Sequence, residues 1–381
     1  YENTINMIVE TMKELSIGNP KNLDVDCGPI INSAAQINLK KYITKARQNN
    51  QVIEELVFEP QNGHFVAPTL IRLNSIEDIH EELFGPILHV ISYKNDDLET
   101  IIDQLNAKGY GLTFGIHSRI DKKVKEISSR VNVGNVYINR NQIGAVVGSQ
   151  PFGGEGLSGT GPKAGGPNSL HGYSSNMLRS EQSKHKMTFT REHFEVQNLI
   201  NPTLQLSKDI LSLLRSKFPS LTAEFLEFLD QEVSRYSHDI KLPGPTGESN
   251  QLIYKPKGTV LCIGPKHKDA LMQTLLSLFL GNCVISQISK QEYESLVEIG
   301  FKTENISQLN DSPSLSLIES NAYNAVLYFG DDNSVNKLIV TSRNELIPVV
   351  SSIYEAWELI KEKVITIDTT ASGGNANLLA L

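Results

Sequence analysis

Residues 139–167 read NRNQIGAVVGSQPFGGEGLSGTGPKAGGP, and nine of the 27 glycines of the chain fall within residues 144–166 of this stretch. Such a density of glycine indicates a backbone that turns sharply and comes close to another part of the structure or to a ligand. A flexible linker is the alternative, but proline, phenylalanine and leucine are interleaved with these glycines, whereas linkers carry mainly serine and glutamine. A strand-like run at 133–139 precedes the stretch, which is where α/β proteins place their binding loops. We therefore interpret it as a binding loop.

The spacing of apolar residues alternates between the helical and the strand period along the first 140 residues. It predicts helices at 3–15, 33–48, 96–107 and 120–131, and strands at 65–72, 87–93, 112–117 and 133–139. Asn32 or Ser33 is expected to cap the second helix. Strands that alternate with helices in this way predict an α/β fold, in which helices cover both faces of a parallel sheet.

The second half of the chain begins with a polar stretch and continues as another α/β pattern. Residues 168–200 are predicted to form an exposed connection that carries an extended hairpin. The following pattern predicts two helices within 203–236, strands at 251–255, 258–264, 282–286, 323–329 and 347–352, and a final strand at 364–370.

The composition limits the kinds of partner that the protein can have. A length of 381 residues suggests two or three domains, and a hydrophobic fraction of 39% is enough for a sizeable core. The net charge of −8 disfavours nucleic acid as a partner, because phosphate binding needs clustered lysine and arginine. No apolar run approaches the length of about 18 residues that a membrane span requires, so no span is predicted.

Three cysteines, Cys27, Cys262 and Cys283, are too few for a disulfide scaffold and favour a reducing cytoplasm. The two later cysteines lie in predicted core strands, where a thiol is usually inert. Neither the histidines nor the cysteines have the spacing of a metal site, so no metal is predicted. The chain starts at Tyr1 with no signal peptide, and we expect it to be a fragment of a longer protein.

Four stretches, in this order along the chain, resemble the aldehyde dehydrogenase family. They are SIGNP at 16–20 with CGPII at 27–31, EELFGPIL at 81–88, PFGGEGLSGTGPKAGGP at 151–167, and TTASGGNANLL at 369–379. More narrowly, they are similar to the branch that oxidises L-glutamate γ-semialdehyde in the bifunctional proline utilization A proteins. One such stretch would be a weak sign, whereas four in the order of the family make the resemblance specific.

The resemblance implies a division into four segments. Residues 1–167 would be the C-terminal part of an aldehyde dehydrogenase catalytic domain, and 168–200 the connection. Residues 201–360 would be an inserted Rossmann-like domain without catalytic role, the C-terminal domain of the aldehyde dehydrogenase superfamily, and 361–381 the returning strand and Gly-Gly-Asn tail. In shorter members of the family that strand follows the glycine-rich loop almost directly, whereas about 195 residues intervene here. The turn at 258–272, GTVLCIGPKHKDALM, lacks the G-x-G-x-x-G pattern of a dinucleotide site.

Glu82 and Phe84 lie in the E-x-F-G-P motif, which puts a carboxylate and a ring on the same side of an extended chain. The resemblance implies that Glu82 accepts hydrogen bonds from ribose hydroxyls of NAD and that Phe84 packs near the nicotinamide. The residues alone favour the start of a strand with a solvated glutamate and a core phenylalanine, and the resemblance reverses this preference. The choice between NAD and NADP stays open.

The loop at 144–152 resembles the aldehyde anchor loop of this branch. The backbone N–H groups of Gly144 and Ala145 would bind the substrate's α-carboxylate, since consecutive N–H dipoles can converge on an anion. Phe152 would flank the aliphatic part of the aldehyde. A turn that only packs on the sheet is the alternative. Arg140 is expected either to support this loop or to satisfy turn carbonyls, and the residues from Ser158 to Gly161 are interpreted as structural.

The family's chemistry needs a cysteine that forms a thiohemiacetal and a glutamate that acts as base. None of the three cysteines fits, so the resemblance implies that both groups lie upstream of Tyr1. We therefore predict no catalytic residue in this chain, and an inactive fragment of an NAD-dependent L-glutamate γ-semialdehyde dehydrogenase.

The resemblance also implies partners in the same polypeptide, among them an upstream proline dehydrogenase domain that binds FAD. The returning strand suggests a homodimer formed by edge pairing. The second hypothesis is a non-catalytic structural or oligomerisation module that covers a substrate-channelling path. The two hypotheses differ in whether the loop at 144–152 and the pair Glu82 and Phe84 converge on one cleft, as a single aldehyde–cofactor pair would require.

Overall fold

The computed structural model describes residues 1–59, 62–173, 205–309, 322–330 and 347–370, together with Leu317 and Lys337. The chain forms two compact units, Tyr1–Lys108 and Gly109–Leu381, which are treated separately below. The greater part of the predicted connection (174–200) and the tail from 371 onward lie outside the described residues. In the part of the chain that is described, no helix has the length and apolar character to cross a membrane.

The first unit is a three-stranded sheet with a helix on each face. Its elements are α1 (Glu2–Lys13), α2 (Ser33–Gln48), β1 (Val52–Glu55), β2 (Thr69–Arg72), η1 (Ile76–Asp78), β3 (Ile87–Val90), η2 (Asn95–Asp97) and α3 (Leu98–Ala107). Side chains alternate across a strand, so Leu70 packs on Ile5 and Met12 of α1, and Ile71 packs with Ala46 of α2. As predicted, the Asn32 side chain caps α2, by accepting a hydrogen bond from Ala35 N–H (2.9 Å).

The predicted parallel pairing holds for the two predicted strands of this unit, but the sheet also has an antiparallel strand. Strand β2 is parallel to β3 but antiparallel to β1, which the sequence analysis did not predict. Strand β1 reads VIEE, and its two successive glutamates hide the alternation that marks a strand.

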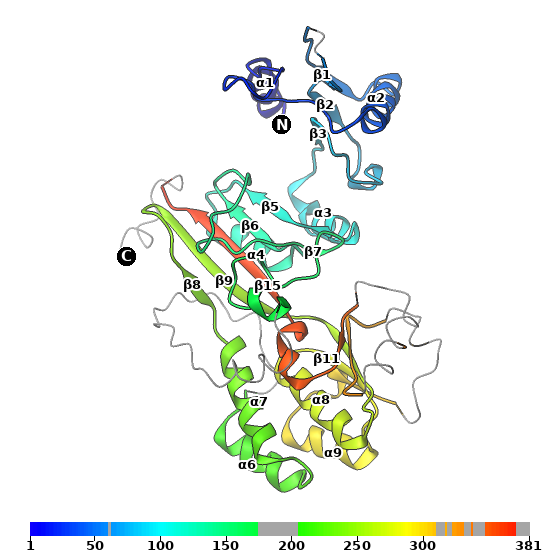
Figure 1. Ribbon diagram of the computed structural model, residues 1–381, viewed down its shortest axis with the longest axis vertical. Helices are drawn as coiled ribbons and strands as arrows, with labels where there is room; N and C mark the ends of the chain where they lie inside the picture. The colour runs from blue at the N-terminus through cyan, green and yellow to red at the C-terminus, as the bar shows by residue number, and fades with distance from the viewer. Residues whose placement is uncertain are drawn as a thin grey trace. The chain divides into compact units, whose positions relative to one another are not determined.

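The second unit contains two five-stranded sheets (Figure 1). The elements of the first are β5 (Thr113–Ile116), α4 (Asp121–Arg130), β6 (Asn135–Ile138), β8 (Ile240–Leu242), β9 (Glu248–Pro256) and β15 (Ile360–Asp368). The second unit also has a short antiparallel pair of strands, β4 (Tyr110–Gly111) and β7 (Glu155–Gly156), and the turn η3 (Ser169–Tyr173). The strand order is β5-β6-β15-β9-β8, with β15 parallel to β6 and antiparallel to β9.

Two expectations about this sheet need correction. Residues 251–255 were grouped with the second α/β pattern, whereas β9 pairs along the whole length of β15 in the first sheet. The returning strand was expected to offer an edge for a dimer, but β15 lies between β6 and β9 and has both edges paired (Figure 1). The edges of this sheet are β5 and β8, so the returning strand gives no support to a homodimer.

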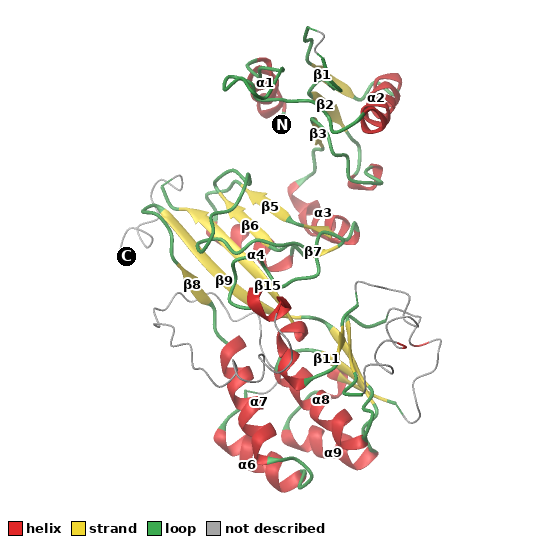
Figure 2. Ribbon diagram, viewed as in Figure 1, coloured by secondary structure: helices red, strands yellow, loops and turns green. Residues whose placement is uncertain are grey.

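The second sheet is parallel throughout and has the strand order of a Rossmann fold. It consists of β10 (Thr259–Cys262), β11 (Cys283–Ser286), β12 (Ile306–Gln308), β13 (Ala325–Leu327) and β14 (Val349–Val350), in the order β12-β11-β10-β13-β14. Helices α6 (Lys208–Lys217), α7 (Ala223–Tyr236), α8 (His267–Phe279) and α9 (Lys290–Ile299) gather on one side of it (Figure 2), and η4 (Thr303–Asn305) and η5 (Ile353–Leu359) complete the fold. Val260 and Cys262 face these helices, and Leu261 packs on the opposite side of the sheet. Of the five strands of this sheet, four were predicted from the sequence. The fifth, β12, has three residues and was not predicted.

The C-terminal end of α4 is held by two lysines of the first sheet. The Nζ atom of Lys363 donates to the carbonyls of Ser128 (2.8 Å) and Val131 (2.5 Å), and Lys255 Nζ donates to Ser129 O (2.6 Å). These carbonyls have no partner inside the helix and carry its negative dipole end, so amine donors are favourable there. Lys363 is fully buried, and burial, followed by the neighbouring Lys255, lowers its pKa to about 6.

We expect this lysine to make the stability depend on pH. In the unfolded chain its pKa returns to about 10.5, so folding releases a proton between pH 6 and pH 10.5. The stability contribution is therefore complete above that window and is lost as the pH falls through it. Lys363→Met should reduce the rise in unfolding free energy between about pH 6.5 and about pH 9.5 by roughly 2–4 kcal/mol, measured by urea denaturation. The control is Lys361→Met, a partly exposed lysine on the same strand, which should leave the rise of the unfolding free energy with pH unchanged. An unchanged rise in Lys363→Met would contradict this account.

Candidate active site

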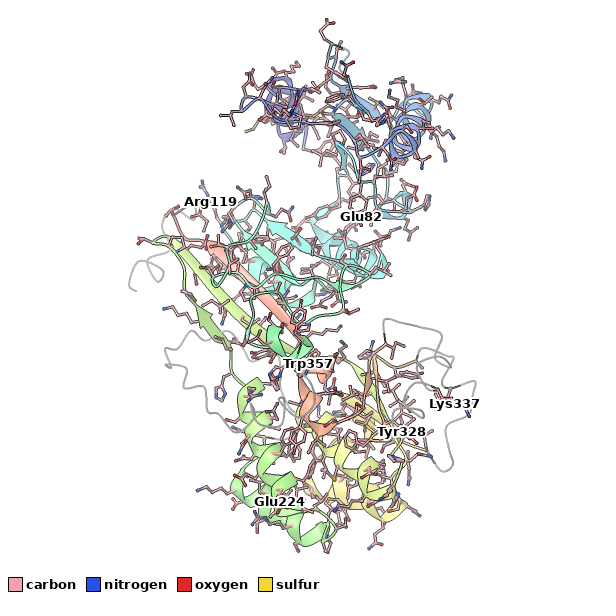
Figure 3. All side chains as sticks on the ribbon, in the orientation of Figure 1. Glu82, Arg119, Glu224, Tyr328, Lys337 and Trp357 are labelled. Carbon is pink, nitrogen blue, oxygen red and sulfur yellow. The ribbon has the colours of Figure 1, made fainter. Side chains whose placement is uncertain are left out.

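Glu82 and Phe84 lie in the loop that leads into β3 of the first unit, where Figure 3 labels Glu82. Leu83 packs toward Leu39 of α2, and Gly85 approaches α2 so closely that a Cβ there would lie 2.5 Å from Leu39 Cδ1. Because neighbouring residues of an extended chain point in opposite directions, Glu82 and Phe84 face away from the helix. Phe84 is 79% exposed, so its ring does not pack in the core of the first unit. An exposed ring beside an exposed carboxylate is suited to a ligand with both an aromatic and a hydroxyl-bearing part.

The loop after β6 begins with a fixed corner. Asn139 has a left-handed backbone (φ 57°), and its side chain accepts from Ser118 N–H (3.0 Å) and donates to Ser118 O (3.1 Å). Gly144 is also left-handed (φ 70°), and its carbonyl accepts a hydrogen bond from Tyr137 Oη (3.3 Å). Gly144 and Ala145 are exposed, and among the described residues neither of their N–H groups donates a hydrogen bond. Two adjacent free N–H groups can receive a carboxylate.

Glu248, the first residue of β9, anchors both ends of this loop. Its carboxylate forms an ion pair with Arg140, and its Oε1 accepts from Gln150 Nε2 (2.9 Å) and from Asn250 Nδ2 (2.8 Å). The Thr366 hydroxyl donates to Asn250 Oδ1 (2.8 Å), which continues the network onto β15. Arg140 thus supports the loop through Glu248. No sequence pattern indicated Glu248, because it lies 108 residues after Arg140 in a segment with no motif of its own.

Phe152 is half-buried near the middle of the glycine-rich stretch. Its N–H donates to Ala164 O (3.0 Å), and its carbonyl accepts from Ala164 N–H (2.9 Å), as in an antiparallel bridge. Ser158 has the structural role expected of it, since its Oγ accepts a hydrogen bond from Gly111 N–H (3.0 Å). The stretch is therefore pinned to its surroundings.

Lys163 and Glu362 are buried next to each other under this stretch. The Lys163 N–H donates to Glu362 Oε2 (2.8 Å), and Asn168 Nδ2 donates to Glu362 Oε1 (2.9 Å). Burial lowers the pKa of Lys163 to about 8 and raises the pKa of Glu362, in each case against the charged form. These residues line a cavity of about 290 Å³.

Cys27 and Cys262 lack the character of an activated nucleophile. Burial raises the pKa of Cys27 and raises that of Cys262 to about 12, whereas a nucleophilic thiol needs a lowered pKa. Cys283 begins β11 and is exposed, contrary to the expectation of a core position. In the residues that the structure describes, no cluster of histidine, cysteine and acidic side chains could hold a metal.

The predicted site residues lie in two separate loops. Gly144, Ala145 and Phe152 share one continuous, anchored stretch of the second unit, whereas Glu82 and Phe84 share one loop of the first. The convergence of these two groups on one cleft stays a prediction.

Residues 1–177 match the model of the Aldehyde dehydrogenase family, so this part of the chain belongs to that family. Over its whole length the chain is similar to the bifunctional protein PutA of Escherichia coli (strain K12), with 34% identity over 400 residues that cover 100% of this chain and 30% of that protein. The 1-pyrroline-5-carboxylate dehydrogenase of Bacillus mycoides (strain KBAB4) is 35% identical over 173 residues, which cover 45% of this chain and 33% of that protein.

A solved structure of proline utilization A from Corynebacterium freiburgense matches 96% of this chain and 34% of that chain, with a TM-score of 0.62 and 22% identity. At that identity the match shows the fold alone. The resemblance inferred from the four stretches, to aldehyde dehydrogenases and to proline utilization A proteins, is confirmed. The chain spans about a third of the length of these relatives.

Proposed function

We propose that this chain is part of a proline-catabolic enzyme in which an aldehyde dehydrogenase oxidises L-glutamate γ-semialdehyde to glutamate with NAD. The observation that carries the proposal is the anchored loop with its two free, adjacent N–H groups at Gly144 and Ala145. Similarity to PutA along the whole chain supports it, as does similarity to 1-pyrroline-5-carboxylate dehydrogenases over 45% of the chain.

The residues would divide the work as follows. Gly144 and Ala145 would bind the α-carboxylate and leave the aldehyde end of the substrate free to react. Phe152 packs on the aliphatic carbons and excludes water from them. Glu82 would hold the ribose hydroxyls of NAD, and the exposed ring of Phe84 would pack near the nicotinamide. NAD, when bound, would accept the hydride. The nucleophilic cysteine and the glutamate that acts as general base would belong to an upstream part of the polypeptide.

We propose an architectural role for the parallel sheet from β10 to β14, as a cover for the path of the intermediate. The first strand–helix turn of such a sheet binds pyrophosphate in dinucleotide-binding proteins. Here the buried Gln273 side chain donates to Gly264 O (2.8 Å) and accepts from Gly264 N–H (3.1 Å), so the turn's own polar groups are already used. This supports the second hypothesis for this part of the chain only.

The proposal is tested on the full-length polypeptide that carries this chain. We expect formation of NADH with L-glutamate γ-semialdehyde, and none with the chain from Tyr1 to Leu381 alone. Phe152→Ala should lower kcat/KM for the semialdehyde by about 10–100-fold, since it removes a side chain that orients the substrate. Leu157→Ala, an exposed residue of the same stretch, is the control and should change kcat/KM by less than about twofold. Absence of oxidation by the full-length polypeptide would refute the proposal.

A further inference from the structure

The side chain of Asn135 holds the backbone on both sides of Phe152. Asn135 is fully buried at the start of β6. Its Nδ2 donates to Pro151 O (3.0 Å), and its Oδ1 accepts from Gly153 N–H (3.3 Å). Together with the two hydrogen bonds to Ala164, these bonds occupy the polar backbone groups at and next to Phe152. The direction of the Phe152 Cα–Cβ bond is therefore fixed by partners outside the loop.

Lys163 locks the amide of Asn135 in this orientation. Its Nζ donates to Asn135 Oδ1 (3.0 Å) and to Gly153 O (2.5 Å), so the amide oxygen must face Lys163 and the amide nitrogen must face Pro151. Lys163 is itself buried and is held through its N–H by Glu362 of β15. The chain of contacts runs from the centre of the sheet to the aromatic residue of the proposed substrate loop.

We propose that Asn135 is a positioning residue that sets the direction in which the Phe152 ring meets the aldehyde. Asn135 itself does not touch the substrate in this account. Its importance for catalysis rests on the proposed function, whereas its effect on the Phe152 ring can be measured without any activity.

The first experiment places 4-fluorophenylalanine at position 152 of the full-length protein and records its ¹⁹F resonance. We expect one narrow line in the unsubstituted protein, and a line broadened at least about twofold or split in Asn135→Ala, because the ring then samples several orientations.

The control is Asn282→Ala, which removes another buried asparagine with three hydrogen bonds. Asn282 accepts from Gly258 N–H (2.9 Å) and donates to the carbonyls of Ser277 (3.2 Å) and Leu359 (3.1 Å). It should lower the unfolding midpoint to a similar extent and leave the fluorine line unchanged. An unchanged line in Asn135→Ala, or an equal change in the control, would overturn the proposal.

Asn135→Asp serves if the alanine variant does not fold. The carboxylate still accepts from Gly153 N–H and Lys163 Nζ but cannot donate to Pro151 O, so the line should still broaden or split. A narrow, unshifted line in this variant would equally overturn the proposal.

The second experiment is a double-mutant cycle on kcat/KM for the semialdehyde. Asn135→Asp alone should lower kcat/KM by about 10-fold, and adding it to Phe152→Ala should lower it little further, because both changes act through the same ring. Additive effects would show that Asn135 does not act through Phe152. If the unsubstituted protein does not oxidise the semialdehyde, the proposed function fails, and the fluorine spectra decide the positioning role alone.

Discussion

Replacing Gly134 by alanine is expected to separate the glycine-rich stretch from β6. A Cβ at Gly134 would lie 1.8 Å from Gly153 O and 2.6 Å from Lys163 Nζ. Overpacking with a methyl group usually costs about 1–3 kcal/mol, when side chains can move aside. Here the obstacle is a backbone carbonyl that is also bound by Lys163, so the cost should reach about 3 kcal/mol or more.

The measurement is the free energy of unfolding in urea, with Gly172→Ala as the matched control. Among the described residues, a Cβ at Gly172 would meet only Pro162, at the ordinary distance of 3.7 Å, so this change should stay within about 0.5 kcal/mol. Equal stabilities of the two variants would contradict the close approach between Gly134 and the carbonyl of Gly153.

The second large effect is expected for Glu362→Ala. The change removes the acceptor of Lys163 N–H and of Asn168 Nδ2, and both donors are buried. A buried donor left without its acceptor typically costs about 1–3 kcal/mol, so the two together should cost about 2–6 kcal/mol. We expect a loss in this range, measured by urea denaturation near neutral pH.

Glu362→Gln separates the charge from the hydrogen bonds. Glutamine keeps the shape and one acceptor, and burial already raises the pKa of Glu362 toward its neutral form, so the loss should be clearly smaller than for alanine. The exposed Glu294, which lies 3.9 Å from Lys290, provides the surface comparison, and its replacement by alanine should have no measurable effect. A loss in Glu362→Ala no larger than in Glu294→Ala would contradict the buried pair.

Local patterns predicted most elements of the fold, because the period of the apolar residues depends only on neighbours in sequence. The helix Ser33–Gln48 is an example, with its bounds and its Asn32 cap both predicted. Short or polar strands escaped, since three residues at β12 and the two glutamates of β1 give no period to read. The exposure of Cys283 also escaped, because the pattern marks a strand but not which neighbours cover its first residue.

The candidate site divides in the same way. Sequence motifs predicted the site residues Glu82, Phe84, Gly144, Ala145 and Phe152. In the structure these residues lie in two loops. The residues that hold the loop, Glu248 and Asn135, carry no motif. Glu248 reaches the loop only because β9, which begins 110 positions after the end of β6, joins the same sheet. The side chain of Asn135 is bound by residues that lie 16 to 28 positions later in the chain.

The amino-acid sequence by itself therefore determined the family, the α/β class and the glycine-rich loop, because these follow from local composition and motif order. Only the tertiary structure decided that β15 lies at the centre of its sheet and that Lys363 is buried at a helix end. It also decided that the side chains of Glu248 and Asn135 form hydrogen bonds to the loop. Each of these depends on contacts between residues far apart in sequence, whose partners are chosen by the packing of the whole unit.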